Sequence, residues 1–398
     1  MRWAWSQTLS PICVVFSPPV ATLPTVGEAE AVPVLPDYSG ACLASMVPSI
    51  FAAQRGEAPQ WLPPAVAEAD QVLLMVLDGL GHDQLLERAD VAPCLSASLA
   101  GRVTSVAPTT TATALTSITT GMTPARHGVV GYRVAVGDGE VMNVLRWATP
   151  AGDARQRVPP KVFQPATAFE GRPIPALTKG EFANTGFTVA HLSGADMRGW
   201  RTPSTLRMRA QAALGEGHRF AYAYYDGIDK VAHEFGLGDL YEAELAFADR
   251  LVSEIGSSLP AGSVMVVVSD HGQVQVGDAV VHIPSGLCGS DVIYCSGEAR
   301  FRWFHLRPGA TDGFAKRLEE EYGDVAWVRT KAQMIEEGWL GGEPSETVSA
   351  RLGDVALVPF AQLAFFDAAD TGELTLVCRH GSLTSAEMWV PLCVITGG

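Results

Sequence analysis

Short apolar runs are the clearest pattern along this chain, and polar residues follow several of them. QVLLMVL at 71–77 and SVMVVV at 263–268 lack polar alternation, which is typical of strands buried on both faces of a parallel sheet. Residues 218–227, HRFAYAYYDG, and 185–193, TGFTVAHLS, predict two further strands.

Helical patterns lie between these runs. Residues 241–259 have apolar positions at helical spacing and predict a long amphipathic helix. Residues 105–121 predict a loop and then a helix that ends at Gly121, and 313–323 predicts another helix. Because strands alternate with helices, the sequence predicts an α/β fold with a largely parallel central sheet flanked by helices.

The domain organisation follows from the same patterns. Residues 1–40 are rich in Pro, Ala and Val without helical period, and predict a disordered N-terminal extension. Residues 41–398 then form the main domain. Within it, 133–180 has many Gly, Pro and charged residues, which predicts an inserted lid or cap.

The net charge of the chain limits the partners that we expect it to bind. The 398 residues include 43 Asp and Glu against 28 Lys and Arg, a formal net charge of -15, so we expect binding to neither nucleic acid nor an anionic membrane. No apolar run approaches the length of a membrane span. An anionic substrate would therefore need a local source of positive charge, such as a bound metal ion.

The number and spacing of the cysteines indicate the cellular compartment. There are seven, scattered and without a CxxC pair, which argues against a cysteine zinc site and predicts ordinary thiols in a reducing, cytoplasmic compartment. The first 24 residues hold one Arg and a short apolar stretch, so a signal peptide, and hence secretion, is the less favoured alternative.

Residues able to bind a metal follow the predicted strands. Asp78 ends the first apolar run, Asp270 and His271 follow a later one, and His380 lies just beyond a third. In an open α/β sheet the site lies outside the carboxyl ends of the strands, so these side chains can converge.

Asp229 and His233 add two ligands, because a spacing of four places both on one face of a helix. Three carboxylates and three imidazoles suit zinc or a similar divalent ion better than Ca²⁺ or Mg²⁺. Six ligands are too many for one tetrahedral ion and fit two.

A nucleophile candidate lies in the Thr109–Thr111 run at the start of a predicted helix, where backbone N–H groups can bind a phosphoryl group. Each motif alone has an ordinary reading. An Asp-Gly is usually a turn, a threonine run is usually a helix cap, and an Asp-x-x-x-His pair is usually a solvated helix face. The joint occurrence of the motifs, in order along the predicted elements, is what favours a site.

These motifs together resemble the alkaline phosphatase superfamily and, within it, the type I phosphodiesterase/nucleotide pyrophosphatase family. The matching segments span about three hundred residues. They are LDGLG (77–81), APTTTATALTSITTGMTPARHGVVGY (107–132), YYDGIDKVAHEFG (224–236), VVVSDHG (266–272) and RHGS (379–382).

The resemblance implies an alkaline-phosphatase-like fold and two divalent ions, Zn²⁺ as the best match. The implied ligands of one ion are Asp229, His233 and His380. The implied ligands of the other are Asp78, Asp270 and His271, with Thr111 bridging toward them. The distances of the family nucleophile from the motif proline and the Thr-Gly glycine point to Thr111, with Thr110 as the alternative.

The chain departs from the family pattern at two places. An Asn that usually follows the His-Gly motif and binds a phosphate oxygen is replaced by Tyr132, with Arg133 adjacent, so these two residues are the expected substrate-binding pair. The Phe-Pro-Asn that commonly follows the nucleophile is replaced by residues 112–114, Ala-Thr-Ala, which alters one wall of the site.

The implied function is that of a metal-dependent phosphodiesterase/nucleotide pyrophosphatase, which hydrolyses small phosphate diesters through a phosphothreonine intermediate at a two-metal site. The absence of a further carboxylate-rich cluster and the acidic charge of the chain favour a diester over a monoester dianion. A phosphomonoesterase or a phosphonate hydrolase on the same scaffold remains the main alternative. A sulfatase is disfavoured because no C/S-x-P-x-R motif occurs, and an inactive binding protein is disfavoured because every ligand position holds a competent residue.

Overall fold

The computed structural model describes residues 32–367, 370 and 375–397. The first 31 residues of the extension predicted over 1–40 lie outside the described part. Residues 32–40 lie along the main body, where the Val34 N–H donates to the Leu383 carbonyl at 2.9 Å and the Tyr38 hydroxyl donates to the Trp339 carbonyl at 2.9 Å.

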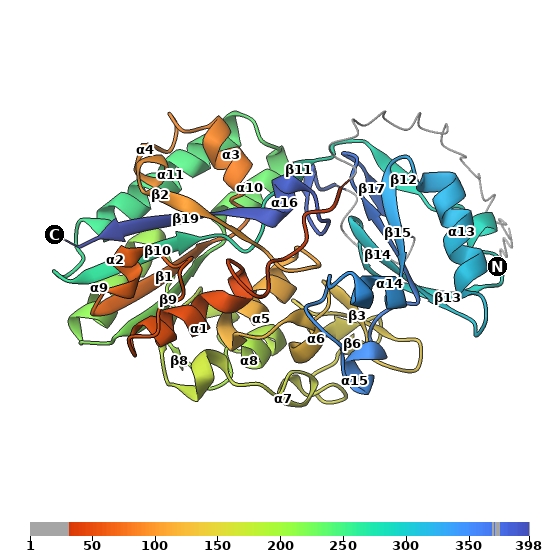
Figure 1. Ribbon diagram of the computed structural model, residues 1–398, viewed down its shortest axis with the longest axis horizontal. Helices are drawn as coiled ribbons and strands as arrows, with labels where there is room; N and C mark the ends of the chain where they lie inside the picture. The colour runs from red at the N-terminus through yellow and green to blue at the C-terminus, as the bar shows by residue number, and fades with distance from the viewer. Residues whose placement is uncertain (1–31, 368–369, 371–374, 398) are drawn as a thin grey trace, which may run out of the picture.

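A seven-stranded sheet forms the centre of the molecule (Figure 1). Its order is β2 (Leu99–Thr104), β19 (Trp389–Thr396), β10 (Ser263–Val268), β1 (Gln71–Leu77), β9 (Phe220–Tyr225), β7 (Pro175–Leu177) and β8 (Asp196–Met197). The five strands from β10 to β8 are parallel, and β19 and β2 join antiparallel at one edge. The predicted largely parallel sheet is confirmed.

Helices cover both faces of this sheet, which explains why β1 and β10 are apolar without alternation. Val72, Leu74 and Val76 face one core, and Leu73 and Met75 face the other. The first core is covered by α1 (Leu43–Ala53), α2 (Pro64–Ala67), α5 (Thr111–Thr120), α6 (Pro124–His127), α7 (Pro160–Phe163) and α8 (Gly186–His191). The second is covered by α3 (His82–Glu87), α4 (Pro93–Ala97), α9 (Pro203–Gly215), α10 (Gly227–Phe235) and α11 (Asp239–Gly256).

A second, antiparallel sheet lies beside the central one, at the right of Figure 1. Its strands are β13 (Val292–Glu298), β14 (Phe301–Leu306), β16 (Val355–Pro359) and β15 (Ala326–Thr330). It packs against α13 (Thr311–Tyr322) around its own small core. Shorter elements surround it: β11 (Val274–Gln275), β12 (Val280–His282), α12 (Ser285–Cys288), α14 (Lys331–Glu336), α15 (Glu346–Ser349), β17 (Ala364–Phe366), β18 (Cys378–Arg379) and α16 (Ser385–Met388).

The segment expected to be an insertion begins as a small antiparallel sheet. Its strands are β3 (Arg133–Ala135), β4 (Val141–Asn143), β5 (Ala148–Thr149) and β6 (Gly152–Asp153). Two short 3-10 turns, η2 (Ala168–Gly171) and η3 (Gly180–Phe182), lie on either side of β7.

One predicted strand is wrong. Within residues 185–193 the chain forms helix α8 (Gly186–His191), and the Thr185 side chain caps this helix by accepting from the Thr188 N–H at 3.2 Å. Its β-branched residues suggested a strand, but Phe187 and Ala190 are buried at helical spacing. The helices predicted around 241–259 and 313–323 are confirmed as α11 and α13, and Gly121 ends α5 in the left-handed conformation at φ 67°. No described helix is long and apolar enough to cross a membrane.

Candidate metal centre and active site

The candidate ligands meet at the carboxyl edge of three adjacent parallel strands, β10, β1 and β9. Asp78 is the first residue after β1, and Asp270 follows β10 after one intervening residue. Asp229 lies in the first turn of α10, which follows β9. Because these strands are neighbours and run in one direction, three carboxylates that are far apart in sequence come together.

Asp78, Asp270 and His271 form a buried cluster, with their ligand atoms within 4.8 Å of one another. His271 Nε2 is 3.4 Å from Asp78 Oδ1 and 3.5 Å from Asp270 Oδ2. Those two carboxylate oxygens are buried and have no hydrogen-bond partner in the described part of the chain. Two such oxygens facing one imidazole nitrogen form a donor set that fits a divalent cation.

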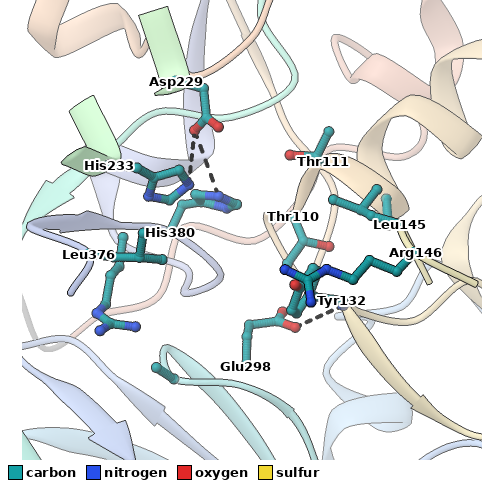
Figure 2. A pocket seen from close by; sticks show the side chains of 13 residues that line it. Thr110, Thr111, Tyr132, Leu145, Arg146, Asp229, His233, Glu298, Leu376 and His380 are labelled. Carbon is teal, nitrogen blue, oxygen red and sulfur yellow. Dashed lines mark hydrogen bonds and ion pairs between the residues drawn. The ribbon is translucent and has the colours of Figure 1, made fainter. Parts of the chain in front are cut away.

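A second cluster adjoins the first. Asp229 Oδ1 is 3.3 Å from His233 Nε2 and 3.9 Å from His380 Nε2, as the dashed lines of Figure 2 show. The His380 ring stacks on His271 with 3.5 Å between centroids. Asp229, His271 and His380 also satisfy the geometry of a shared metal site. The structure thus brings all six predicted ligands into two adjoining groups.

Backbone carbonyls orient the three imidazoles. The Nδ1 atoms of His233, His271 and His380 lie 2.7, 3.0 and 2.8 Å from the carbonyl oxygens of Cys378, Gly272 and Thr109 respectively. Nδ1 therefore carries the proton, and the Nε2 lone pair of each ring faces the carboxylates. A carbonyl that fixes the tautomer in this way is a common feature of histidines that bind metals.

The electrostatics of the clusters also favour a cation. Burial, and then the nearby charges of Asp270 and Asp229, raise the pKa of Asp78 well above its usual value, and burial raises that of Asp270. Burial and the neighbouring His271 and His233 hold the pKa of His380 well below its usual value, so this ring is neutral and able to bind a metal. A divalent ion would offset the repulsion among the carboxylates.

Among the three threonines, Thr111 directs its hydroxyl at a metal-type ligand. Its Oγ1 is 3.2 Å from His271 Nε2, at the N-terminus of α5. Thr110 caps the helix by accepting from the Thr113 N–H, and the Thr109 hydroxyl donates to the Ser382 carbonyl at 2.7 Å. The neighbouring hydroxyls therefore have structural partners, whereas the Thr111 hydroxyl faces the metal-type ligands.

A pocket of about 310 Å³ opens in front of Thr111 and the second cluster. Tyr132 lines it, and its hydroxyl accepts from Asn143 Nδ2 at 2.6 Å. Figure 2 shows Arg146 extending into the pocket toward Tyr132 and Thr110.

Arg133 is not brought to this pocket, in contrast to the sequence-based expectation. Its guanidinium forms an ion pair with the buried Asp370, which also binds Arg302. Arg133 borders a different depression, between the small sheet and β13. Tyr132 precedes β3 and Arg133 is the first residue of that strand, and the two side chains line different depressions.

Several contributors were not found from the sequence. The Tyr224 hydroxyl donates to Asp78 Oδ2, and Gln273 Nε2 donates to Asp229 Oδ1 at 2.5 Å. Arg146 and Glu298 line the pocket from the small sheet and from β13. The position of Tyr224, two residues before the polar end of β9, offered a signal. Nothing local marked Glu298, since the second sheet brings it to the site.

The fold and this centre define a class: an α/β protein with a metal-type centre at the carboxyl edge of a largely parallel sheet. Residues 72–383 match the family model described as type I phosphodiesterase / nucleotide pyrophosphatase. The chain therefore belongs to this family and is a hydrolase acting on phosphoric ester or anhydride bonds. No curated protein matches the chain in sequence comparison.

Solved structures share the fold at low sequence identity. Murine ectonucleotide pyrophosphatase/phosphodiesterase 5 aligns with a TM-score of 0.60 and 13% identity over 82% of this chain and 88% of that one. The human protein gives 0.57 and 15% over the same shares. Phosphonoacetate hydrolase from Sinorhizobium meliloti 1021, in complex with phosphonoformate, gives 0.59 and 17% over 83% and 91%.

The unpartnered carboxylate oxygens lead to a prediction about metal and stability. In chelator-treated protein, Asp270→Asn should raise the melting temperature, because it removes a buried negative charge while its oxygen still accepts from the Gly79 and His271 N–H groups. Added zinc should raise the melting temperature of the wild type by several degrees and that of the variant by clearly less. Thermal unfolding with and without zinc measures both effects.

Asp312→Asn, at the start of α13 and outside the site, is the control and should respond to zinc as the wild type does. An equal zinc response in Asp270→Asn would show that this carboxylate does not bind the metal.

Proposed function

We propose that this protein hydrolyses phosphate diesters at a two-metal centre, with Thr111 as the nucleophile. Asp229, His233 and His380 would hold one divalent ion, and Asp78, Asp270 and His271 would hold the other. The observation that carries the proposal is the Thr111 hydroxyl, 3.2 Å from His271 Nε2 at the junction of the clusters. The mixed carboxylate and imidazole donors suit Zn²⁺.

The ions, when bound, would polarise the phosphoryl oxygens and lower the pKa of a coordinated hydroxyl. Thr111 loses its proton and attacks phosphorus, so that an Oγ1–P bond forms, one ester P–O bond breaks, and the departing oxygen takes up a proton. Water then attacks the phosphothreonine and releases Thr111 and a phosphate monoester. Backbone N–H groups at the start of α5 face the phosphoryl group and stabilise its negative charge.

Other features support the proposed substrate and setting. Tyr132 lines the pocket, and its hydroxyl accepts from Asn143 Nδ2, which holds it close to the place where a phosphate group would bind. The described residues form two groups of metal-type ligands and no third, which fits a singly charged diester better than a monoester dianion. The six cysteines in the described part are free thiols, which supports the proposed cytoplasmic location.

Substitution of Thr111 tests the mechanism. With bis(p-nitrophenyl) phosphate as substrate, Thr111→Ala should lower kcat by about a thousandfold or more, because the covalent nucleophile is lost. Thr110→Ala, one residue away, should lower kcat by about tenfold at most, since Thr110 serves as a helix cap. Metal content measured on the same samples shows whether the centre stays intact. The reverse order of sensitivity would assign the nucleophile to Thr110.

The diester preference is tested on the same enzyme. We expect kcat/KM for bis(p-nitrophenyl) phosphate to exceed that for p-nitrophenyl phosphate by about tenfold or more at one pH, because the monoester brings an additional charge that no third cation compensates. A clear preference for the monoester would replace the diesterase proposal with a phosphomonoesterase.

A second candidate function is favoured by one observation. Arg146 is exposed in the pocket, and its guanidinium has no ion-pair partner among the described residues. A guanidinium can bind a carboxylate or phosphate through two parallel hydrogen bonds. The second candidate is therefore the hydrolysis of a phosphonate or phosphate ester that carries another anionic group, as phosphonoacetate does.

Arg146→Ala separates the two candidates. If the natural substrate has a second anion, the variant should lose about ten- to hundredfold in kcat/KM on phosphonoacetate and little on bis(p-nitrophenyl) phosphate. Arg155→Ala is the matched control, since Arg155 lies in the same small sheet region but is ion-paired with Asp153. Equal losses of kcat/KM on both substrates would show that Arg146 does not bind a second anionic group.

A further inference from the structure

A second cavity lies on the other side of Thr111 from the pocket described above. It has a volume of about 250 Å³ and shares Thr111, Leu145 and Asp229 with the first pocket. Its remaining walls come from α5, β9, the segment 178–191, Asp78 after β1, and Asp226 and Lys230 at the start of α10. A group bound at Thr111 therefore has two separate spaces into which its substituents can extend.

The walls of this cavity are mainly carbon. Leu115, Phe182 and Phe187 line it, together with the shared Leu145. His191 stacks on Phe187 with 4.1 Å between ring centroids, and burial lowers its pKa to about 4, so the ring is uncharged at neutral pH. We call this space the apolar cavity.

The charges at the edge of the apolar cavity are already paired. The Lys230 ammonium is 2.6 Å from Asp226, which also binds Lys179 at 2.7 Å. The other two carboxylates, Asp78 and Asp229, belong to the groups of metal-type ligands. Both ammonium groups near this cavity therefore contact the same carboxylate, whereas the Arg146 guanidinium has no ion-pair partner among the described residues.

Two hydroxyls in the wall have no hydrogen-bond partner in the described part of the chain. They belong to Tyr222, fully buried on β9, and Thr178, which is 4% exposed. Both hydroxyl oxygens have almost no accessible surface, so an occupant of the cavity would meet little polar surface from them. A nucleoside brings many polar atoms, most of which would meet carbon here.

We propose that the apolar cavity binds one ester or carbon substituent of the substrate, an aryl or short alkyl group. This inference rests on the proposed function, since it names the class of diester or phosphonate that the same site accepts. The size is sufficient, because a cavity of about 150 Å³ holds benzene. The substrate class is thus a small aryl or alkyl phosphodiester or phosphonate, in preference to a nucleotide.

Binding of phosphonates that need not be hydrolysed tests this directly. Dissociation constants of methylphosphonate and benzylphosphonate are measured by calorimetry on the zinc-loaded full chain. Benzylphosphonate should bind about ten- to hundredfold more tightly, because its ring leaves water for the apolar cavity. AMP should bind less than threefold more tightly than methyl phosphate.

Phe182→Ala removes one wall of the cavity. The ratio of the affinities for benzylphosphonate and methylphosphonate, called here the benzyl-to-methyl advantage, should fall by about three- to tenfold. Unchanged binding of methylphosphonate would show that the metal centre is intact. Phe366→Ala is the matched control, since Phe366 is equally half-buried but lies on β17, outside the cavity. The control should keep the full advantage.

Three results would overturn the inference: equal affinity for the two phosphonates, the same advantage in Phe182→Ala as in the wild type, or a larger gain for AMP than for benzylphosphonate. The last result would assign the cavity to a nucleoside. Failure of the proposed function is a different outcome, seen as a lack of diester hydrolysis, and it does not affect the calorimetric comparison.

Discussion

The arrangement of this molecule depends on three carboxylates that are held together with little access to water. Asp78, Asp229 and Asp270 lie at the ends of adjacent parallel strands or in the helix that follows, and the strand pairing fixes their separation. Like charges in a medium of low polarity repel strongly, so this arrangement opposes folding unless protons or cations compensate it. The free energy of cation binding can therefore contribute directly to the stability of the fold, which is why the site and the sheet cannot be understood separately.

The segment that supplies His380 is fixed from a distance by a second buried charge pair. Arg300, fully buried between β13 and β14, binds both carboxylate oxygens of Glu387 at 2.8 Å. Glu387 also accepts from the Ser382 N–H at 3.0 Å, two residues after the histidine. The antiparallel sheet thus helps to orient a ligand of the central sheet. Removing one partner of such a pair usually costs about 3–5 kcal/mol, so this contact constrains the position of His380 strongly.

The central sheet and its ligands could be predicted from the sequence because both are encoded locally. Eight residues, 71–78, are enough to predict the strand, its burial and the position of the carboxylate, because an apolar run leads directly to Asp78. Arg133 and Arg146 show where prediction from the local sequence fails. Which of two arginines in a small, irregular sheet faces the pocket depends on the distant Asp370, and that partner is not visible in the local sequence. The same holds for α8, where one capping threonine outweighed the strand preference of its neighbours.

At the two cavities that meet at Thr111, the reacting residues and the walls that would contact the rest of the substrate belong to different parts of the fold. The reacting edge is built from strands and helices whose positions are set by hydrogen bonding and charge. The walls that would contact the rest of a substrate come from the small sheet at 133–153 and the segment 178–191, which carry no metal-type ligand. Substitutions in these walls can change which substituents fit without moving the carboxylates. Arg146, which has no ion-pair partner in the described part of the chain, lies on one side, and the carbon-lined cavity lies on the other. These two features therefore carry more information about the substrate than the metal-type ligands do.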